Sequence, residues 1–338
     1  MTDYKEIKGF NIEELASDPP APFEGQVWYN TTDDQLKVYS SYPTGAWAVG
    51  ANLIHYRTSL KCVGTQTAAL TVGGLDTRGP QWGAQITESY NGTAWTEVNQ
   101  LNKGRDGMGA FGTQTAAIGT GGRGGFSGNP FPDLNDALVE SWNGSSWSEV
   151  ADLSSARFRG GGAGTSTAGI NFGGQPNPYT SSPVALNESW NGSSWTEVGD
   201  LNAIFTGTGW GTQTAAIAMR NATTGIVESW NGSAWTVEAD PNQYTGIGSV
   251  AKGGTSTDGL VYGGPANGFS TESWNGSAWT SLANSNFNST QAGGAGTSSS
   301  ALKAGGNSSP LTMVQSGAQT EEWVAPVNVN RVVQNKPN

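Results

Sequence analysis

One phrase recurs along this chain, at intervals that copies of a single supersecondary unit would give. It joins Glu-Ser to Trp-Asn-Gly-Ser-x-Trp, where x is Ser or Ala. The copies span residues 88–95, 140–147, 188–195, 228–235 and 272–279, the first with Tyr and Thr in place of the leading Trp and the Ser. A shortened copy ends at Trp323. Tandem copies of one unit pack on their neighbours, so we expect an array or a ring.

A second phrase, Gly-Thr-Gln-Thr-Ala-Ala or a related form, precedes each copy of the first, which we expect to fold as a β-hairpin around its Asn-Gly turn. Its glycines are Gly64, Gly112, Gly164, Gly211, Gly254 and Gly296, separated by 48, 52, 47, 43 and 42 residues. A glycine pair follows nine positions later in five copies. The pattern predicts four strands per unit: a short strand of small residues, an apolar strand, the strand of Glu-Ser-Trp, and a last strand after a tight Asn-Gly turn.

Composition favours strands and tight turns over helices. Glycine provides 50 of 338 residues and only 13% of residues are charged. The formal net charge of -11 argues against a nucleic-acid partner, and no segment predicts membrane insertion or an export signal. The single Cys62 and the single His55 permit neither an intrachain disulfide nor a His-rich metal site. We therefore expect no cofactor and no metal.

A glycine pair closing the second strand, followed by an aromatic residue and a spaced Trp, resembles the kelch repeat of β-propellers. The wording of both phrases is similar to kelch-like propellers in tail-fibre and virion proteins of marine bacteriophages, over about residues 45–325. The resemblance implies an all-β, six-bladed propeller. Residues 25–31 and 36–39, expected to form a small N-terminal hairpin element, resemble a motif frequent near the start of phage fibre proteins.

Spacing predicts how such a ring closes. The second Trp of three hairpins lies 17 residues before the next phrase glycine, and Trp47 lies 17 residues before Gly64. By this spacing Trp47 belongs to a fourth strand that has no preceding three strands of its own unit. The last copy has its first three strands, which end at Trp323, but no fourth strand. We predict that the strand near Trp47 completes the sixth blade and covers its open edge.

A ring of seven blades is the alternative. Residues 26–30 and 36–39 would then be the second and third strands of a further blade, and residues 327–333 its inner strand. In the favoured six-bladed arrangement the chain has three parts. These are an attachment segment at residues 1–44, the propeller at residues 45–325, and a tail at residues 326–338.

The repeated tryptophans admit two interpretations. Each could stack on a sugar, or each could pack against the neighbouring blade and bury about 150–250 Å². Because the chain is poor in aliphatic residues, we expect packing. The repeated glutamates could likewise form a functional ring, but structural pairing across blades is the expected role.

Recognition is expected on the face that carries the loops of variable length, because binding residues favour loops on a rigid scaffold. Aromatic residues on the longest of these loops are binding candidates: Trp82, Phe126, Phe131 and Tyr179. Arg57, Arg105 and Arg157 stand seven residues before the phrase glycine in the first three units, with Ile204, Ile247 and Ser289 at the corresponding later positions. They could point to the channel mouth and bind a carboxylate, or pair with the repeated glutamates.

Function follows from the resemblance and from what the chain lacks. No recognisable acid, base, nucleophile and metal constellation is present, so we expect no enzyme, although two carboxylates could meet as in a glycosidase. The expected role is a non-catalytic bacteriophage virion protein, a tail fibre or appendage. It would be present in multiple copies, dock onto other virion proteins through Trp28, Tyr29 and Tyr39, and bind a host glycan or protein. The alternative is a propeller that decorates or braces the virion without a receptor.

Overall fold

The computed structural model describes residues 12–20, 22–23, 25–42, 45–76, 83–124, 136–176, 182–220, 226–243, 251–263, 269–307, 317–325 and 327–335. These residues form strands and turns, and none of them lies in a helix. None therefore belongs to a helix that could cross a membrane. The chain divides into two compact units, unit 1 (Met1–Ala46 with Ala325–Asn338) and unit 2 (Trp47–Val324).

The repeats form antiparallel four-stranded sheets, as their spacing predicts. Sheet 1 holds β6 (Lys61–Gly64), β7 (Ala69–Val72), β9 (Thr87–Tyr90) and β10 (Trp95–Val98); sheet 2 holds β12 (Gly109–Gly112), β13 (Ala117–Thr120), β15 (Val139–Trp142) and β16 (Trp147–Val150); sheet 3 holds β17 (Gly161–Thr165), β18 (Ala168–Phe172), β19 (Asn187–Trp190) and β20 (Trp195–Val198). Each is a meander in chain order.

Within the described residues, sheets 4 and 5 are further meanders in chain order, and sheet 6 takes its fourth strand, β4 (Ala46–Val49), from before the first repeat. Sheet 4 holds β21 (Gly207–Gly211), β22 (Ala216–Arg220), β23 (Val227–Trp230) and β24 (Trp235–Val237); sheet 5 holds β25 (Ala251–Thr255), β26 (Asp258–Tyr262), β27 (Thr271–Trp274) and β28 (Trp279–Ser281); sheet 6 holds β29 (Gly293–Gly296), β30 (Ser300–Ala304), β31 (Thr320–Val324) and β4. Thus β4, which contains Trp47, lies beside β31, where the sequence places it. The arrangement is compatible with a β-propeller.

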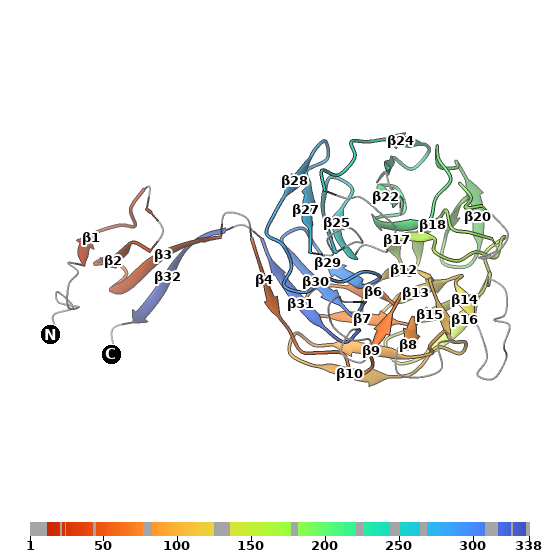
Figure 1. Cartoon of the computed structure of the whole chain (residues 1–338), viewed down its shortest axis with the longest axis horizontal. Helices are drawn as coiled ribbons and strands as arrows, with labels where there is room; N and C mark the ends of the chain where they lie inside the picture. Colours follow the sequence, from red (N-terminus) through yellow and green to blue (C-terminus); the bar gives the residue numbers. More distant parts are fainter. Residues whose placement is uncertain are drawn as a thin grey trace. The chain divides into compact units, whose positions relative to one another are not determined.

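The first strand of each sheet lies innermost and the fourth lies outermost (Figure 1). Consecutive inner strands are in contact from β6 through β12, β17, β21 and β25 to β29, and β29 also contacts β6. Small residues dominate these strands because a Cβ would collide with a neighbour. A Cβ on Gly162 would lie 2.9 Å from the Phe111 ring, and one on Gly253 would lie 2.7 Å from the Gly296 carbonyl oxygen.

The tryptophans of each hairpin pack between sheets, as expected. Trp142 and Trp147 are directly paired across β15 and β16, with ring centroids 5.4 Å apart. They share a core cluster with Val63 and Leu70 of sheet 1. The indole Nε1 of Trp147 also donates to Thr87 Oγ1 of sheet 1 at 3.1 Å. Gly144 meets the predicted need for positive φ, at 94°.

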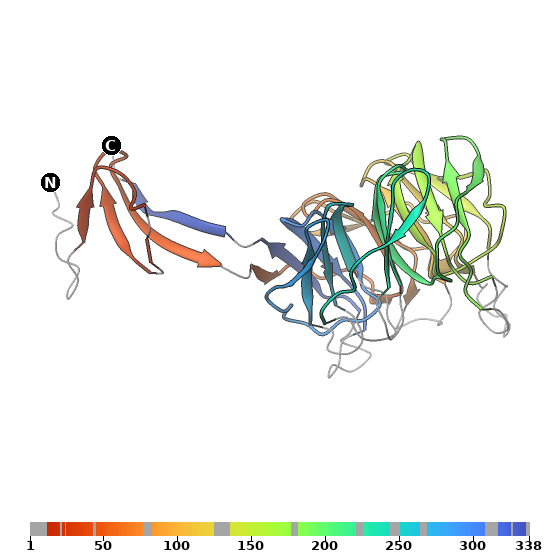
Figure 2. The ribbon, with the colours of Figure 1, turned by 90° about the horizontal axis from the view of Figure 1, so that it is seen from above.

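Unit 1 contains a separate sheet in the order β1 (Glu13–Leu15), β2 (Val27–Asn30), β3 (Gln35–Tyr42) and β32 (Val327–Asn335). The predicted strands at residues 26–30 and 36–39 are present, but β32 pairs with β3 (Figure 2). In the alternative seventh blade it would pair with β2. The C-terminal residues, expected as a tail, thus contribute a nine-residue strand to the N-terminal unit.

Candidate functional site

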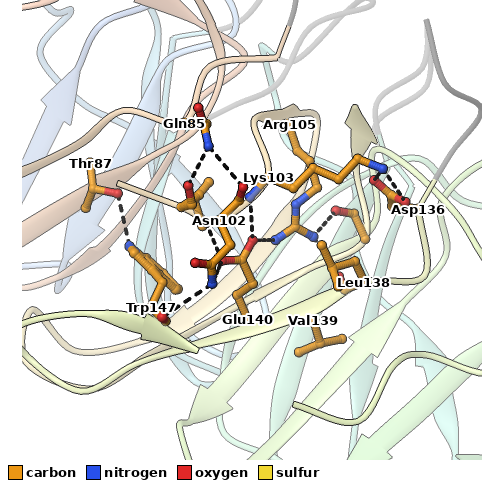
Figure 3. A network of polar contacts seen from close by, with 12 residues as sticks. Gln85, Thr87, Asn102, Lys103, Arg105, Asp136, Leu138, Val139, Glu140 and Trp147 are labelled. Atoms are coloured by element: carbon orange, nitrogen blue, oxygen red, sulfur yellow. Dashed lines mark hydrogen bonds and ion pairs between the residues drawn. The ribbon is translucent and has the colours of Figure 1, made fainter. Parts of the chain in front are cut away.

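The three predicted arginines lie where the chain enters sheets 1, 2 and 3, and their side chains are buried. Arg105 shows the arrangement (Figure 3): its Nη2 lies 2.9 Å from Glu140 Oε1, and its Nη1 donates to the carbonyl oxygens of Gly121 and Leu138 at 2.7 and 2.6 Å. Both charged side chains are 0% exposed. Burial lowers the pKa of Arg105, and the charge of Glu140 opposes this shift. Arg57–Glu88 and Arg157–Glu188 repeat the pair.

The prediction of a carboxylate-binding cluster at the channel mouth is therefore wrong, and the alternative of pairing with the repeated glutamates is confirmed. The reason lies in the connecting segment. Glu140 Oε2 accepts hydrogen bonds from the backbone N–H of Asn102 at 2.8 Å and from its side-chain amide at 3.0 Å, which fixes the connector on β15 (Figure 3). The arginine that follows is thereby drawn into the sheet. Pairing occurs within the sheet that the connector enters, not across sheets as expected.

Sheet 4 lacks the ion pair. Glu228 accepts the backbone N–H groups of Asn202 and Ala203 at 2.8 and 3.1 Å, and no cation contacts it within the described residues. Phe205 takes the position of the arginine: its carbonyl oxygen accepts from Gly174 N, as that of Arg105 accepts from Gly74 N. The alignment by spacing, which placed Ile204 there, is one residue out of register. Ile204 is 46% exposed and Phe205 is 3% exposed.

Sheet 6 obtains its cation from another strand, which the sequence did not predict. Lys303 on β30 lies opposite Glu321 on β31 and its Nζ is 2.5 Å from that carboxylate. The pair is buried. A single lysine in a strand of small and apolar residues was the signal that could have revealed it, because such a charge is buried only with a partner.

A cavity of about 140 Å³ lies between the inner strands. Residues from β6, β12, β17, β21, β25 and β29 line it, most of them glycine or alanine. The larger side chains on it are Phe111 and Trp210, and Cys62 contributes a buried thiol. We call this space the axial cavity. Its lining offers mainly backbone groups and apolar surface.

A series of four backbone hydrogen bonds links the points at which the chain enters five of the inner strands. The N–H of Ser59 donates to the Gln291 carbonyl at 2.9 Å, Gly107 to Ser59 at 3.4 Å, Arg159 to Gly107 at 2.6 Å, and Gly207 to Arg159 at 3.1 Å. We call these five residues the entry ring. Ser59, Arg159 and Gln291 have φ of 54°, 59° and 60°. Left-handed backbone costs a non-glycine residue about 1–2 kcal/mol.

Positive charge collects beside the entry ring. The guanidinium carbons of Arg159 and Arg123 lie 4.9 and 5.5 Å from the ring centroid of Phe158. Arg123 forms a two-pronged pair with Asp106, Nε to Oδ1 at 3.1 Å and Nη2 to Oδ2 at 3.0 Å. Lys61 follows on β6, and burial with the nearby charge of Arg159 lowers its pKa to about 8. Sequence reasoning missed this group because its members come from three different repeats.

The aromatic candidates have different outcomes. Trp82, Phe126, Phe131 and Tyr179 lie outside the described residues. In unit 1 Trp28 is 0% exposed, and its Nε1 donates to Asp18 Oδ1 at 3.1 Å, so this side chain is part of the buried core of unit 1. Tyr29 is half-buried and its hydroxyl bonds Asp34, while Tyr39 is half-buried.

Asp18 organises this part of unit 1. Besides Trp28 it accepts a hydrogen bond from Asn30 Nδ2 at 2.8 Å and pairs with Lys37 Nζ at 3.0 Å. Hydrogen bonds from Lys37 to Asp33 and Asp18 raise the lysine's pKa. The carboxylates thereby keep a buried lysine charged.

No group of three His, Cys, Asp or Glu side chains suited to a metal ion occurs among the residues with a described placement. Comparison of the sequence with protein-family models and with curated proteins finds no match.

Proposed function

We propose that unit 2 is a six-bladed, kelch-like β-propeller closed by β4. The support is that the contacts joining sheet 6 to sheet 1 repeat those between consecutive sheets. Gln114 of sheet 2 donates to the Tyr90 carbonyl of sheet 1 at 2.5 Å, and Gln66 of sheet 1 donates to the Trp323 carbonyl of sheet 6 at 2.8 Å. Trp95 Nε1 bonds Thr320 Oγ1 as Trp147 bonds Thr87.

Matched substitutions test this closure. Gln66→Leu and Gln114→Leu each remove three side-chain hydrogen bonds that cross between sheets. In a closed ring both should lower the free energy of unfolding by about 1–3 kcal/mol. If Gln66→Leu left the chemical denaturation curve unchanged while Gln114→Leu shifted it, the ring would be open at this seam.

We further propose that the chain is a non-catalytic bacteriophage virion protein, a tail fibre or appendage, in which unit 1 docks onto other virion proteins and unit 2 presents a recognition face. The division into two compact units carries the proposal, because it separates a small sheet formed by both ends of the chain from the repeated scaffold. The motifs at residues 25–31 and 36–39, which resemble phage fibre proteins, fall on β2 and β3 of unit 1.

Truncation tests the docking role. Since β32 pairs with β3, residues 1–44 and 326–338 should be removed together, leaving β4 and Trp47 in place. The shortened chain should keep the β-sheet circular dichroism of unit 2 but fail to enter particles. Incorporation of the shortened chain at the level of the full chain would refute docking through unit 1.

A glycan array probed with the full chain tests recognition. Binding to a subset of glycans supports a receptor-binding appendage. Uniform absence of binding, together with normal particle incorporation, would favour a propeller that decorates or braces the virion through protein contacts.

A further inference from the structure

Sheet 6 differs from the other repeat sheets in how its third and fourth strands are joined. In sheet 2 the chain passes from Trp142 to Trp147 through four residues, which form the Asn-Gly turn. In sheet 6 the chain instead leaves β31 into β32, and it enters β4 from β3. Along the chain, unit 1 therefore stands where the other sheets have a tight turn.

The tryptophans of sheet 6 pack as those of a hairpin do. The ring centroids of Trp47 and Trp323 are 5.4 Å apart, the same separation as in the Trp142 and Trp147 pair. Trp47 Nε1 donates to Thr271 Oγ1 of sheet 5 at 2.9 Å, just as Trp147 Nε1 donates to a threonine of sheet 1. Sheet 6 thus has the packing of the hairpin without its covalent turn.

The two chain segments are paired both in sheet 6 and in unit 1. In sheet 6 the N–H of Gly50, directly after β4, donates to the Thr320 carbonyl of β31 at 2.9 Å. In unit 1 Tyr42, the last residue of β3, pairs with Val327, the first residue of β32. Tyr42 lies eight residues before Gly50, and Val327 lies seven residues after Thr320. The two pairings therefore have nearly the same antiparallel offset.

The pairing in unit 1 is long and begins close to sheet 6 along the chain. β3 and β32 are paired over eight residue pairs. Only residues 43–45 on one segment and 325–326 on the other separate this ladder from β4 and β31. A tight turn keeps two strands at a high effective concentration for each other, and a paired ladder joined to both strands by short links has the same effect.

A buried ion pair stabilises the sheet of unit 1. Lys37 on β3 is 7% exposed, and its Nζ lies 3.0 Å from Asp18 Oδ1. Asp18 also accepts hydrogen bonds from Trp28 and Asn30 on β2. A change at Asp18 therefore weakens unit 1 without altering any residue of unit 2.

We propose that unit 1 is a clasp for the ring of unit 2: the pairing of β3 with β32 keeps β4 beside β31, in place of the tight turn of the other sheets. This inference rests on the proposed closure by β4 and not on the virion role. It gives unit 1 a second role besides docking, because whatever separates β3 from β32 also loosens the seam between sheets 6 and 1.

The test is amide hydrogen exchange, measured by mass spectrometry, on the full chain and on a chain without residues 326–338. The deletion removes β32 and leaves β4 and β31 intact. Peptides that cover β4 and β31 should exchange about tenfold faster or more, because the ends of these strands are then free to fray. Peptides that cover β15 and β16, which a covalent turn joins, are the internal control and should exchange as in the full chain.

Two substitutions make the same comparison in a chain of full length. Asp18→Asn should weaken unit 1 and speed exchange over β4 and β31 about threefold or more. Glu14→Gln on β1 is the matched control, because it neutralises a carboxylate of unit 1 that is exposed. It should leave exchange over β4 and β31 unchanged.

Unchanged exchange over β4 and β31 in both the deleted chain and the Asp18→Asn chain would overturn the clasp. Equal acceleration over sheets 2 and 6 would also overturn it, because the effect would then be general. Failure of the proposed closure looks different: β4 would exchange as fast as an unstructured peptide in the unaltered chain, before any change to unit 1.

Discussion

Sheets 2 and 4 fold alike but treat the same glutamate differently. In sheet 2 Glu140 accepts backbone amides of the connector and also pairs with Arg105. In sheet 4 Glu228 accepts the same amides, while Phe205 fills the arginine's place and packs against Phe172, with ring centroids 5.6 Å apart. The shared role of the glutamate is thus to hold the connector. The arginine is an addition that the aromatic residue can replace.

The largest difference should come from removing the glutamates. Glu140→Ala leaves Arg105 buried without its counter-ion and should lower the free energy of unfolding by about 3–5 kcal/mol. Glu228→Ala leaves the backbone N–H groups of Asn202 and Ala203 and the side-chain amide of Asn202 without their acceptor, but no buried cation, and should cost about 1–3 kcal/mol. Denaturant unfolding of both variants gives the comparison. Equal losses would mean that the ion pair adds nothing beyond the connector.

Removing the cation should cost less than removing the carboxylate. Arg105→Leu leaves Glu140 with its amide donors, the state in which Glu228 already exists, so we expect a loss of about 1–3 kcal/mol. Arg57→Leu in sheet 1 provides a second example of the same change. A loss in Arg105→Leu larger than in Glu140→Ala would show that the arginine, rather than the glutamate, organises the connector.

A smaller effect is expected from the bonds between sheets. Thr87→Val removes the acceptor of Trp147 Nε1 and should cost about 1 kcal/mol. Sheet 2 carries Val139 at the corresponding position of β15, and the next tryptophan, Trp195, instead donates to the Ala151 carbonyl at 3.0 Å. If Trp147 can make a similar bond, Thr87→Val would be neutral in a thermal melt, and the threonine would be dispensable.

The smallest effect is expected from an exposed pair in sheet 1, because solvent weakens its interaction compared with the buried pairs. His55 Nε2 lies 3.0 Å from Glu97 Oε2, and this hydrogen bond, followed by that of Gln100, lowers the pKa of Glu97. His55→Ala should raise that pKa toward 4.5 in an NMR titration. Because the folded pKa is depressed, any contribution to stability is present above the unfolded pKa and lost as pH falls through the folded one. An unchanged Glu97 pKa would contradict the pairing.

Much of the fold followed from local patterns. The strands around the tryptophans and the positive φ of the glycine in the Asn-Gly turn were predicted because strand alternation and turn chemistry act over a few residues. The strand at Trp47 beside β31 was predicted from the spacing of the repeats instead. The charged sites were predicted less well. Spacing assigned Ile204 to the arginine position, since it could not detect that the chain reaches the start of sheet 4 one residue later in the repeat.

The sequence by itself determined that the chain is built from repeated four-stranded meanders with tryptophans between them, because each repeat contains the residue patterns that form its own turns and strands. The tertiary structure decided which charges are paired and which are not. Arg105 and Arg159 are both arginines next to the entry to an inner strand, yet Arg105 is buried against a glutamate, whereas Arg159 lies over the Phe158 ring and forms no ion pair within the described residues. Pairing of charges depends on contacts between segments far apart in the sequence, and only the packed sheets bring those segments together.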